Sequence, residues 1–243
     1  MHSNIQPSSV SSPSRRGLLR TALAGTAAAG SVLALGSAFP ASAEPVTDGR
    51  PTTPQEALGR LSAGNRRWAA YRQEHPHESP SVRLRLTEAQ HPFAIVLGCV
   101  DSRVPPELVF DQGLGDLLTV RSAGEVLDEA VLGSIAYGVL ELDIPLVMVL
   151  AHQSCGAVGA AVHADETGER LPAHIQYLAE QIGPAIDHGL HGDARVDATI
   201  DAHARSTRRR LAAEPDLARR MATGKLAVVA ARYQLRDQRI RTL

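Results

Sequence analysis

The sequence is short of several features that would assign it to a common class of protein. Aromatic residues make up only 3% of the 243 positions, so the core must be packed mainly with aliphatic side chains. The 25 basic residues are balanced by 26 acidic ones and form no basic patch, so we expect no nucleic-acid partner. No uninterrupted run of about 18 strongly apolar residues is present, and we therefore expect no membrane span in the mature protein.

Acidic residues are missing altogether from the first 43 positions. This segment instead carries the pair Arg15-Arg16, then a weakly apolar stretch rich in alanine and glycine, and finally an Ala-Ser-Ala sequence that ends at Ala43. The small residues are those a signal peptidase accepts, and the whole pattern resembles a twin-arginine export signal. We expect residues 1–43 to be a signal peptide, and the mature protein to be exported to the cell envelope, the periplasm or the extracellular space.

The rest of the chain is organised as one domain over residues 53–243, after a flexible leader rich in proline, threonine and glycine over 44–52. A helix should begin at Thr53, because Thr53 and Glu56 have the spacing of a capping box. Longer amphipathic segments, such as 126–142, separate four apolar runs. Those runs predict strands over residues 93–98, 117–120, 146–151 and 226–233. Such alternation predicts an α/β fold with a mainly parallel central sheet flanked by helices.

Residues that can bind a metal follow two of these predicted strands. They lie in the sequences Cys99-Val100-Asp101-Ser102-Arg103 and His152-Gln153-Ser154-Cys155-Gly156. The carboxyl ends of parallel strands are where open α/β sheets form their ligand crevices. Two thiolates and an imidazole favour zinc, and three protein ligands leave the fourth position open, as in catalytic zinc sites. We therefore predict one Zn²⁺ per chain, bound by Cys99, His152 and Cys155.

A disulfide between Cys99 and Cys155 is the competing interpretation, because two cysteines in an exported protein commonly pair. The position of His152 three residues before Cys155 favours the metal. The export route that the signal resembles carries proteins already folded, so the metal could be loaded before the chain meets an oxidant.

Asp101 and Arg103 are the predicted catalytic residues. The Asp101 carboxylate could accept a hydrogen bond from the zinc-bound nucleophile, provided that Arg103 holds it away from the metal by a bidentate pair. Asp101 could otherwise become the fourth metal ligand itself. We therefore count Asp101 among the candidate ligands, and the sequence is compatible with both an open and an Asp101-ligated resting site.

One histidine pair is not expected to bind a metal. His75 and His77 flank a proline in the polar segment 74–92, which we interpret as a connection. We expect both imidazoles to be solvated.

Taken together, these motifs resemble those of beta-class carbonic anhydrases. The family pattern C-x-D-S-R followed by H-x-x-C-G matches residues 99–103 and 152–156. Its G-D-x-x-x-x-R-N-A-G segment matches residues 115–124, with Ser122 in place of the usual asparagine. Residues 224–235 resemble the final strand and turn of the family. The resemblance covers essentially the whole chain after the predicted signal.

The resemblance implies an activity and an assembly. The implied reaction is reversible hydration of carbon dioxide to bicarbonate by attack of zinc-bound hydroxide, with Asp101 orienting the nucleophile and Arg103 positioning Asp101. It also implies a beta-carbonic-anhydrase-like fold with an N-terminal helical arm that reaches over the partner of a homodimer or larger homo-oligomer.

Two other functions are compatible with the same residues. The zinc site could hydrolyse carbon disulfide or carbonyl sulfide, since the fold does not determine the substrate. Alternatively, zinc closed by Asp101 could serve only to hold the fold or the assembly together.

Overall fold

A five-stranded sheet organises the protein, for which the computed structural model describes residues 49–243. The strands are β1 (Ala94–Gly98), β2 (Leu117–Arg121), β3 (Leu146–His152), β4 (Ala227–Tyr233) and β5 (Ile240–Thr242). Their order is β2-β1-β3-β4-β5, and every pairing is parallel except that of β4 with β5. The mainly parallel sheet predicted from the sequence is thereby confirmed. The proposed signal peptide lies outside the described residues.

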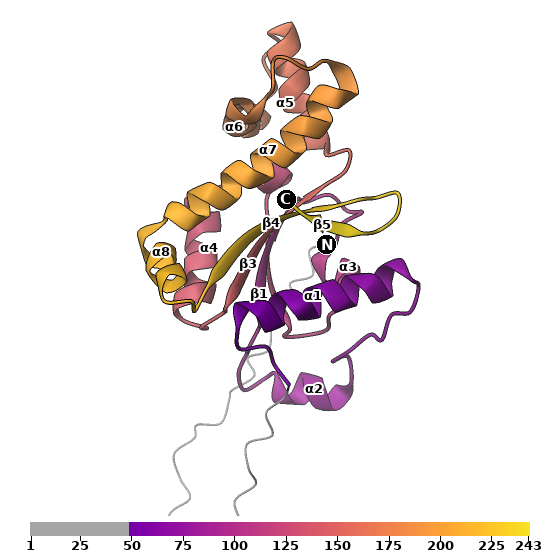
Figure 1. Ribbon diagram of the computed structural model, residues 1–243, viewed down its shortest axis with the longest axis vertical. Coiled ribbons are helices and arrows are strands. Elements are labelled where there is room, and N and C mark those ends of the chain that lie inside the picture. Colours follow the sequence, from indigo (N-terminus) through magenta and orange to yellow (C-terminus); the bar gives the residue numbers. More distant parts are fainter. Residues whose placement is uncertain (1–48) are drawn as a thin grey trace, which may run out of the picture. The chain divides into compact units, whose positions relative to one another are not determined.

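One face of the sheet packs against the helices from the middle and the end of the chain (Figure 1). These are α4 (Glu129–Leu140), α5 (Gly156–Thr167), α6 (Ile175–Ile182), α7 (Gly192–Ala213) and α8 (Pro215–Ala222), with the short 3₁₀ turns η1 (Ala123–Glu125) and η2 (Gly183–Ala185). Ile95, Leu97 and Val149 point from the strands into this cluster, where Ile135 of α4 and Ile200 of α7 meet them. The side chains are aliphatic, as the scarcity of aromatic residues requires.

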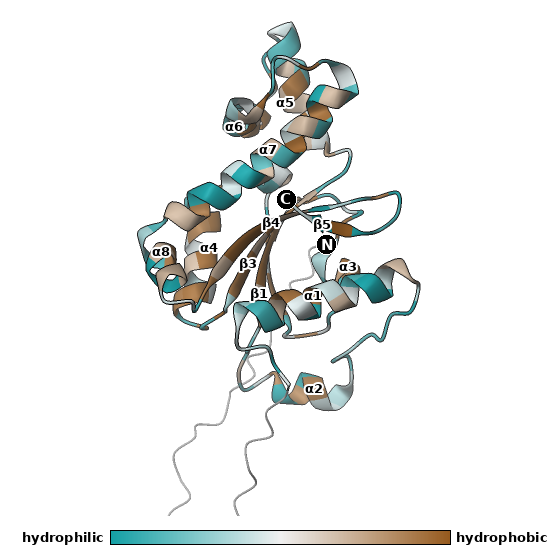
Figure 2. Ribbon diagram, viewed as in Figure 1, coloured by the Kyte–Doolittle hydropathy of each residue, from teal (hydrophilic) through white to brown (hydrophobic). Residues whose placement is uncertain are grey.

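The opposite face is covered by α1 (Pro54–Ala69) and α3 (Pro106–Val109). Val96 and Met148 pack there with Leu61 of α1, because alternate residues of a strand face opposite sides of a sheet. Figure 2 shows the resulting pattern, in which the strands between the two helical layers are hydrophobic. Gly64 lets α1 approach closely, since a Cβ at this position would lie 1.7 Å from the Phe110 carbonyl oxygen.

The predicted element boundaries agree with the structure to within a few residues. Thr53 caps α1, and the expected capping box with Glu56 is present. Two elements differ from the expectation. The segment 74–92 is not only a connection, because it contains the helix α2 (Pro80–Arg85), and the chain adds the antiparallel strand β5 after β4. Within residues 49–243, no helix is both long and apolar enough to cross a membrane.

Candidate metal centre

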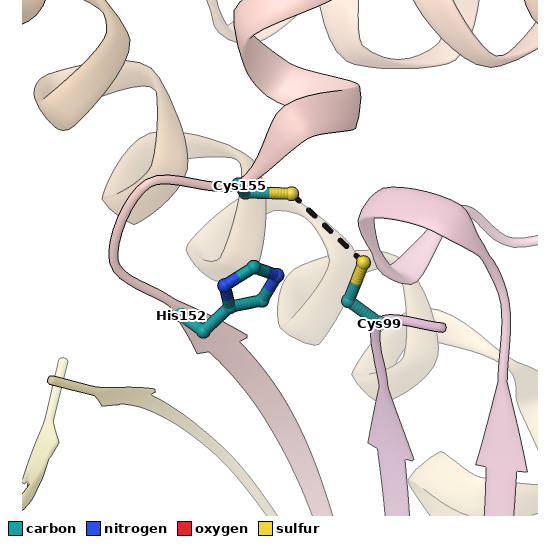
Figure 3. A group of neighbouring side chains, drawn as sticks. All are labelled: Cys99, His152 and Cys155. Atoms are coloured by element: carbon teal, nitrogen blue, oxygen red, sulfur yellow. Dashed lines mark hydrogen bonds between the residues drawn. The ribbon is translucent and has the colours of Figure 1, made fainter. Parts of the chain in front are cut away.

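The three predicted metal ligands come together at the carboxyl ends of two neighbouring strands. His152 is the last residue of β3, Cys99 directly follows β1, and Cys155 precedes the first turn of α5. Because Gly98 pairs with Leu150 in parallel register, the segments that carry Cys99 and His152 leave the sheet at the same edge. Figure 3 shows the two sulfur atoms and the imidazole ring facing one another across the gap between the segments.

The spacing of the donor atoms fits a metal and does not fit a disulfide. All three ligand atoms lie within 4.8 Å of one another, and the Sγ atoms of Cys99 and Cys155 are 3.9 Å apart. A disulfide requires about 2.05 Å between sulfurs, and both cysteines are free. Tetrahedral zinc with Zn–S bonds of about 2.3 Å would place two sulfurs roughly 3.8 Å apart. Of the residues described, this is the group of histidine, cysteine and acidic side chains that could hold a metal ion.

The orientation of His152 also fits a ligand. The ring is fully buried, and its Nδ1 lies 2.9 Å from the Gln153 carbonyl oxygen, so Nδ1 is assigned as the protonated nitrogen that donates this bond. Nε2 is then left with its lone pair, buried and without a hydrogen-bond partner in the described chain. A buried polar atom without a partner is costly, and a metal ion would satisfy it.

The Cys99 and Cys155 side chains are hydrogen-bonded to each other, and their pKa values are shifted in opposite directions. Their mutual hydrogen bond is the largest influence on both, and it lowers the pKa of Cys99 to about 4. The same bond and burial raise the pKa of Cys155. The Gly124 amide also donates to Cys99 Sγ over 3.3 Å, which supports the thiolate. The pair is therefore a thiolate beside a thiol, ready to lose its remaining proton to a cation.

Asp101 lies beside the three donors and is held by Arg103. The Arg103 Nε and Nη2 atoms donate to Oδ1 and Oδ2 of the carboxylate over 2.9 and 2.7 Å, and the Arg103 amide donates to Oδ1 over 2.9 Å. These bonds, led by the side-chain pair, lower the pKa of Asp101 to about 2. Asp101 Oδ2 remains 3.8 Å from His152 Nε2, so the carboxylate faces the donors while its charge is taken up by Arg103.

Other residues fix the loops that carry the ligands, and the sequence reasoning did not assign them a role. Arg121, at the end of β2, donates from Nε to the Cys99 carbonyl oxygen and from Nη2 to that of Asp101. His203 of α7 contacts the Gly124 carbonyl oxygen through Nε2 over 2.7 Å, and so holds the peptide that precedes Glu125 in place. Arg121 lies within the segment 115–124 that resembles the family pattern, so the sequence offered a signal for it. Nothing near His203 in the sequence points to the metal centre.

Glu125 is a further buried acid beside the centre. Its side chain is 2% exposed, and Oε1 has no partner among the described residues. Burial, followed by the charge of Cys99, raises its pKa well above the ordinary range. Burial and the nearby Cys99 sulfur therefore both favour the neutral form of the Glu125 carboxyl group.

The comparisons with known proteins agree on one family. The family model described as "Carbonic anhydrase" matches residues 94–240. The chain is 43% identical over 190 residues to carbonic anhydrase 2 of Mycobacterium tuberculosis, a match that covers 77% of this chain and 92% of that protein. It is 42% identical over 191 residues to the carbonic anhydrase of Mycolicibacterium smegmatis, covering 78% and 93%.

Solved structures show the same fold. The beta-carbonic anhydrase CcaA superposes with a TM-score of 0.63 at 20% identity, covering 76% of this chain and 86% of that one. A tetrameric beta-carbonic anhydrase of the ascomycete Sordaria macrospora also gives 0.63 at 20% identity, covering 76% and 96%.

Proposed function

The chain belongs to the beta-class carbonic anhydrase family, and from this premise we propose which residues carry out its reaction. The reaction is the reversible hydration of carbon dioxide to bicarbonate, and it depends on zinc. The observation that carries the residue assignment is the convergence of Cys99, His152 and Cys155, with the buried His152 Nε2 left without a partner. These three residues would hold the metal. When bound, zinc supplies a Lewis acid that makes water a nucleophile at neutral pH.

Asp101 and Arg103 would orient the reacting groups. The Asp101 carboxylate would accept a hydrogen bond from the attacking water or hydroxide, and its low pKa keeps it an acceptor throughout the neutral range. Arg103 would keep Asp101 from binding the metal, because both carboxylate oxygens accept hydrogen bonds from the guanidinium. Arg103 Nη2 also lies 3.3 Å from the Ser154 carbonyl oxygen, so the same side chain ties together the two loops that supply the ligands.

Stopped-flow measurement of carbon dioxide hydration by the zinc-loaded protein tests this function. Hydrolysis of carbonyl sulfide and carbon disulfide is measured on the same samples. We expect hydration to be the fast reaction. Hydrolysis of the sulfur compounds without hydration would show a different substrate, and a full complement of zinc with neither reaction would show a structural metal.

We also propose that the protein is a homodimer, or a larger assembly built from dimers, with contacts along the edge strand β2. Within residues 49–243, strand β2 pairs only with β1, so its outer backbone groups have no strand partner in this part of the chain and can contact another chain. Beside it, the α4 residues Tyr137 and Leu140 are 50% and 42% exposed. One further support is that solved structures of this fold include tetrameric enzymes.

Replacing Tyr137 by aspartate should weaken this assembly, because the charge would be buried in the contact. Sedimentation velocity should show a shift towards monomer at micromolar concentration. Leu84→Asp, at a 72% exposed position on α2, is the matched control and should leave the assembly unchanged. Equal sedimentation of both variants and the parent chain would place the contact elsewhere.

We propose, finally, that the protein is exported through the twin-arginine pathway and that residues 1–43 are removed. The support is the acid-free leader with its Arg15-Arg16 pair and the small residues before position 44. Replacing both arginines by lysine should block export, as measured by cell fractionation and immunoblotting, whereas Arg20→Lys should not. Unchanged export of the double variant would contradict the assignment.

A further inference from the structure

A second pocket lies at the opposite end of the sheet from the metal centre. It has a volume of about 430 Å³ and is built around Phe93, which precedes β1, and Asp116, which precedes β2. The metal ligands follow the carboxyl ends of the strands, so the length of β1, roughly 16 Å, separates the two sites. The pocket is therefore not part of the catalytic centre.

The pocket combines positive charge with an apolar wall. Two acidic side chains line the pocket, Glu88 and Asp116. The basic side chains outnumber them and are Arg50, Arg60, His77, Arg85 and His91. The apolar wall is formed by Val82, Leu86, Phe93 and Leu114.

The buried carboxylate of Asp116 already accepts hydrogen bonds from other residues. Asp116 accepts the Gly113 amide over 2.8 Å and lies 2.8 Å from His77 Nδ1. His77 is therefore not simply solvated, which corrects the expectation from the sequence. Asp116 also forms an ion pair with Arg60, whose Nη2 lies 4.0 Å from Oδ1, so its charge partly offsets that arginine and leaves Arg50 and Arg85 as the cations available to a ligand.

Two of the arginines retain hydrogen-bonding capacity that nothing in the described chain uses. Arg85 is exposed at the end of α2, and its guanidinium has no partner among residues 49–243. Arg50 donates to the Pro92 carbonyl oxygen, but its Nε is buried without an acceptor in the same region. Arg60 is held in place, with its guanidinium carbon 5.2 Å from the centre of the Phe93 ring. The wall is tight as well, since a Cβ at Gly115 would lie 2.7 Å from Leu86.

We propose that this pocket binds a small organic carboxylate, with its apolar body against Phe93 and Leu86 and its carboxylate on Arg85. Arginine forks match carboxylates in geometry, and the unpartnered donors supply the hydrogen bonds. The volume is in the range of sites for organic ligands, and a bare inorganic oxyanion would fill only a small part of it. If the ligand were an inorganic oxyanion, the apolar wall would have no role in binding. We therefore assign an organic ligand.

Calorimetric titration of the zinc-loaded full chain with 2-naphthoate tests the proposal, with the neutral 2-naphthalenemethanol as the uncharged analogue. We expect naphthoate to bind the parent chain and to bind Arg85→Gln at least tenfold more weakly. Arg83→Gln carries the same change on the same helix, at an exposed position outside the pocket, and should bind as the parent does. The neutral analogue should bind at least tenfold more weakly than naphthoate.

Amide chemical shifts locate the bound probe, since a carboxylate could also reach the metal. Shifts at Phe93 and Gly115 would support the proposal, and carbon dioxide hydration by Arg85→Gln should equal that of the parent. Shifts confined to Gly124 and Gly156, beside the metal ligands, would overturn it. Equal affinity of Arg83→Gln and Arg85→Gln, equal affinity of the neutral analogue, or no binding at millimolar naphthoate would overturn it too.

Discussion

Replacing His152 by alanine should abolish carbon dioxide hydration, with kcat/KM falling by at least about a thousandfold, because the centre loses its nitrogen donor. Two sulfur donors remain, and they bind zinc too weakly to keep it through dialysis against a mild chelator. Zinc per chain, measured by atomic emission, should fall well below one. Stopped-flow hydration of the same dialysed samples gives the rate.

A histidine elsewhere in the chain provides the control for this change. His163 of α5 has a 61% exposed side chain, so His163→Ala should retain both zinc and activity. Because His152 is fully buried, Cys155→Ser serves as a second variant that removes a ligand with little change in volume. Circular dichroism confirms that the proteins compared are folded. Folded His152→Ala with a full complement of zinc and the parent rate would remove His152 from the metal site.

Replacing Arg103 by alanine should lower kcat/KM about a hundredfold while zinc content stays at one per chain. The metal ligands are untouched, but Asp101 loses the two side-chain hydrogen bonds that hold its carboxylate. The freed carboxylate lies 3.8 Å from His152 Nε2, close enough to reach the metal position. The visible absorption spectrum of the cobalt-substituted variant should change accordingly, because it reports which atoms coordinate the metal.

The pH dependence of activity in Arg103→Ala distinguishes displacement of the Asp101 carboxylate from its protonation. Arg103 lowers the pKa of Asp101 to about 2, and without it the pKa returns towards the ordinary value of about 3.9. Both values lie below neutral pH, so Asp101 stays ionised in the variant, and the defect should persist from pH 6 to 9. A variant defective only below about pH 4 would instead indicate simple protonation.

The lowered pKa of Asp101 also makes the stability of the folded protein depend on pH. A lowered pKa means that Asp101 stabilises the folded state fully above about pH 4 and loses this contribution as the pH falls towards 2. In Arg103→Ala this acid-dependent part of the stability should shrink.

Two matched variants accompany Arg103→Ala. Arg103→Lys keeps the charge but cannot form the bidentate pair, so its rate should be intermediate. Arg209→Ala, at an exposed position on α7, should behave as the parent. Parent activity of Arg103→Ala at every pH would show that another group holds Asp101.

The sequence predicts well those features that depend on local pattern. The buried runs around Ile95 and Val149 are continuous and apolar, so their strands are readily identified. The Thr53 capping box marks the start of α1 because both of its residues lie within one turn. Cys99, His152 and Cys155 are found for a similar reason, since each lies at or shortly after the end of a strand that is clear in the sequence.

Features that depend on contacts far apart in the chain are not predicted. The pairing of His203 with Gly124 spans 79 positions, and that of His77 with Asp116 spans 39. A histidine in such a contact has no distinguishing neighbours in the sequence. Strand β5 is only three residues long and polar, so its pairing with β4 gives no periodic pattern to detect.

The placement of His152 has a consequence for how the protein exchanges its metal. Strand β3 is bonded to β1 as far as Leu150 and to β4 as far as His152, and all seven of its residues are buried. Backbone in such a position opens only when the whole domain unfolds, whereas exposed loops open locally at little cost. Metal can therefore enter and leave through motions of the loops after Cys99 and before Cys155, while the imidazole stays in place. The buried imidazole would then act as a fixed anchor for the returning ion.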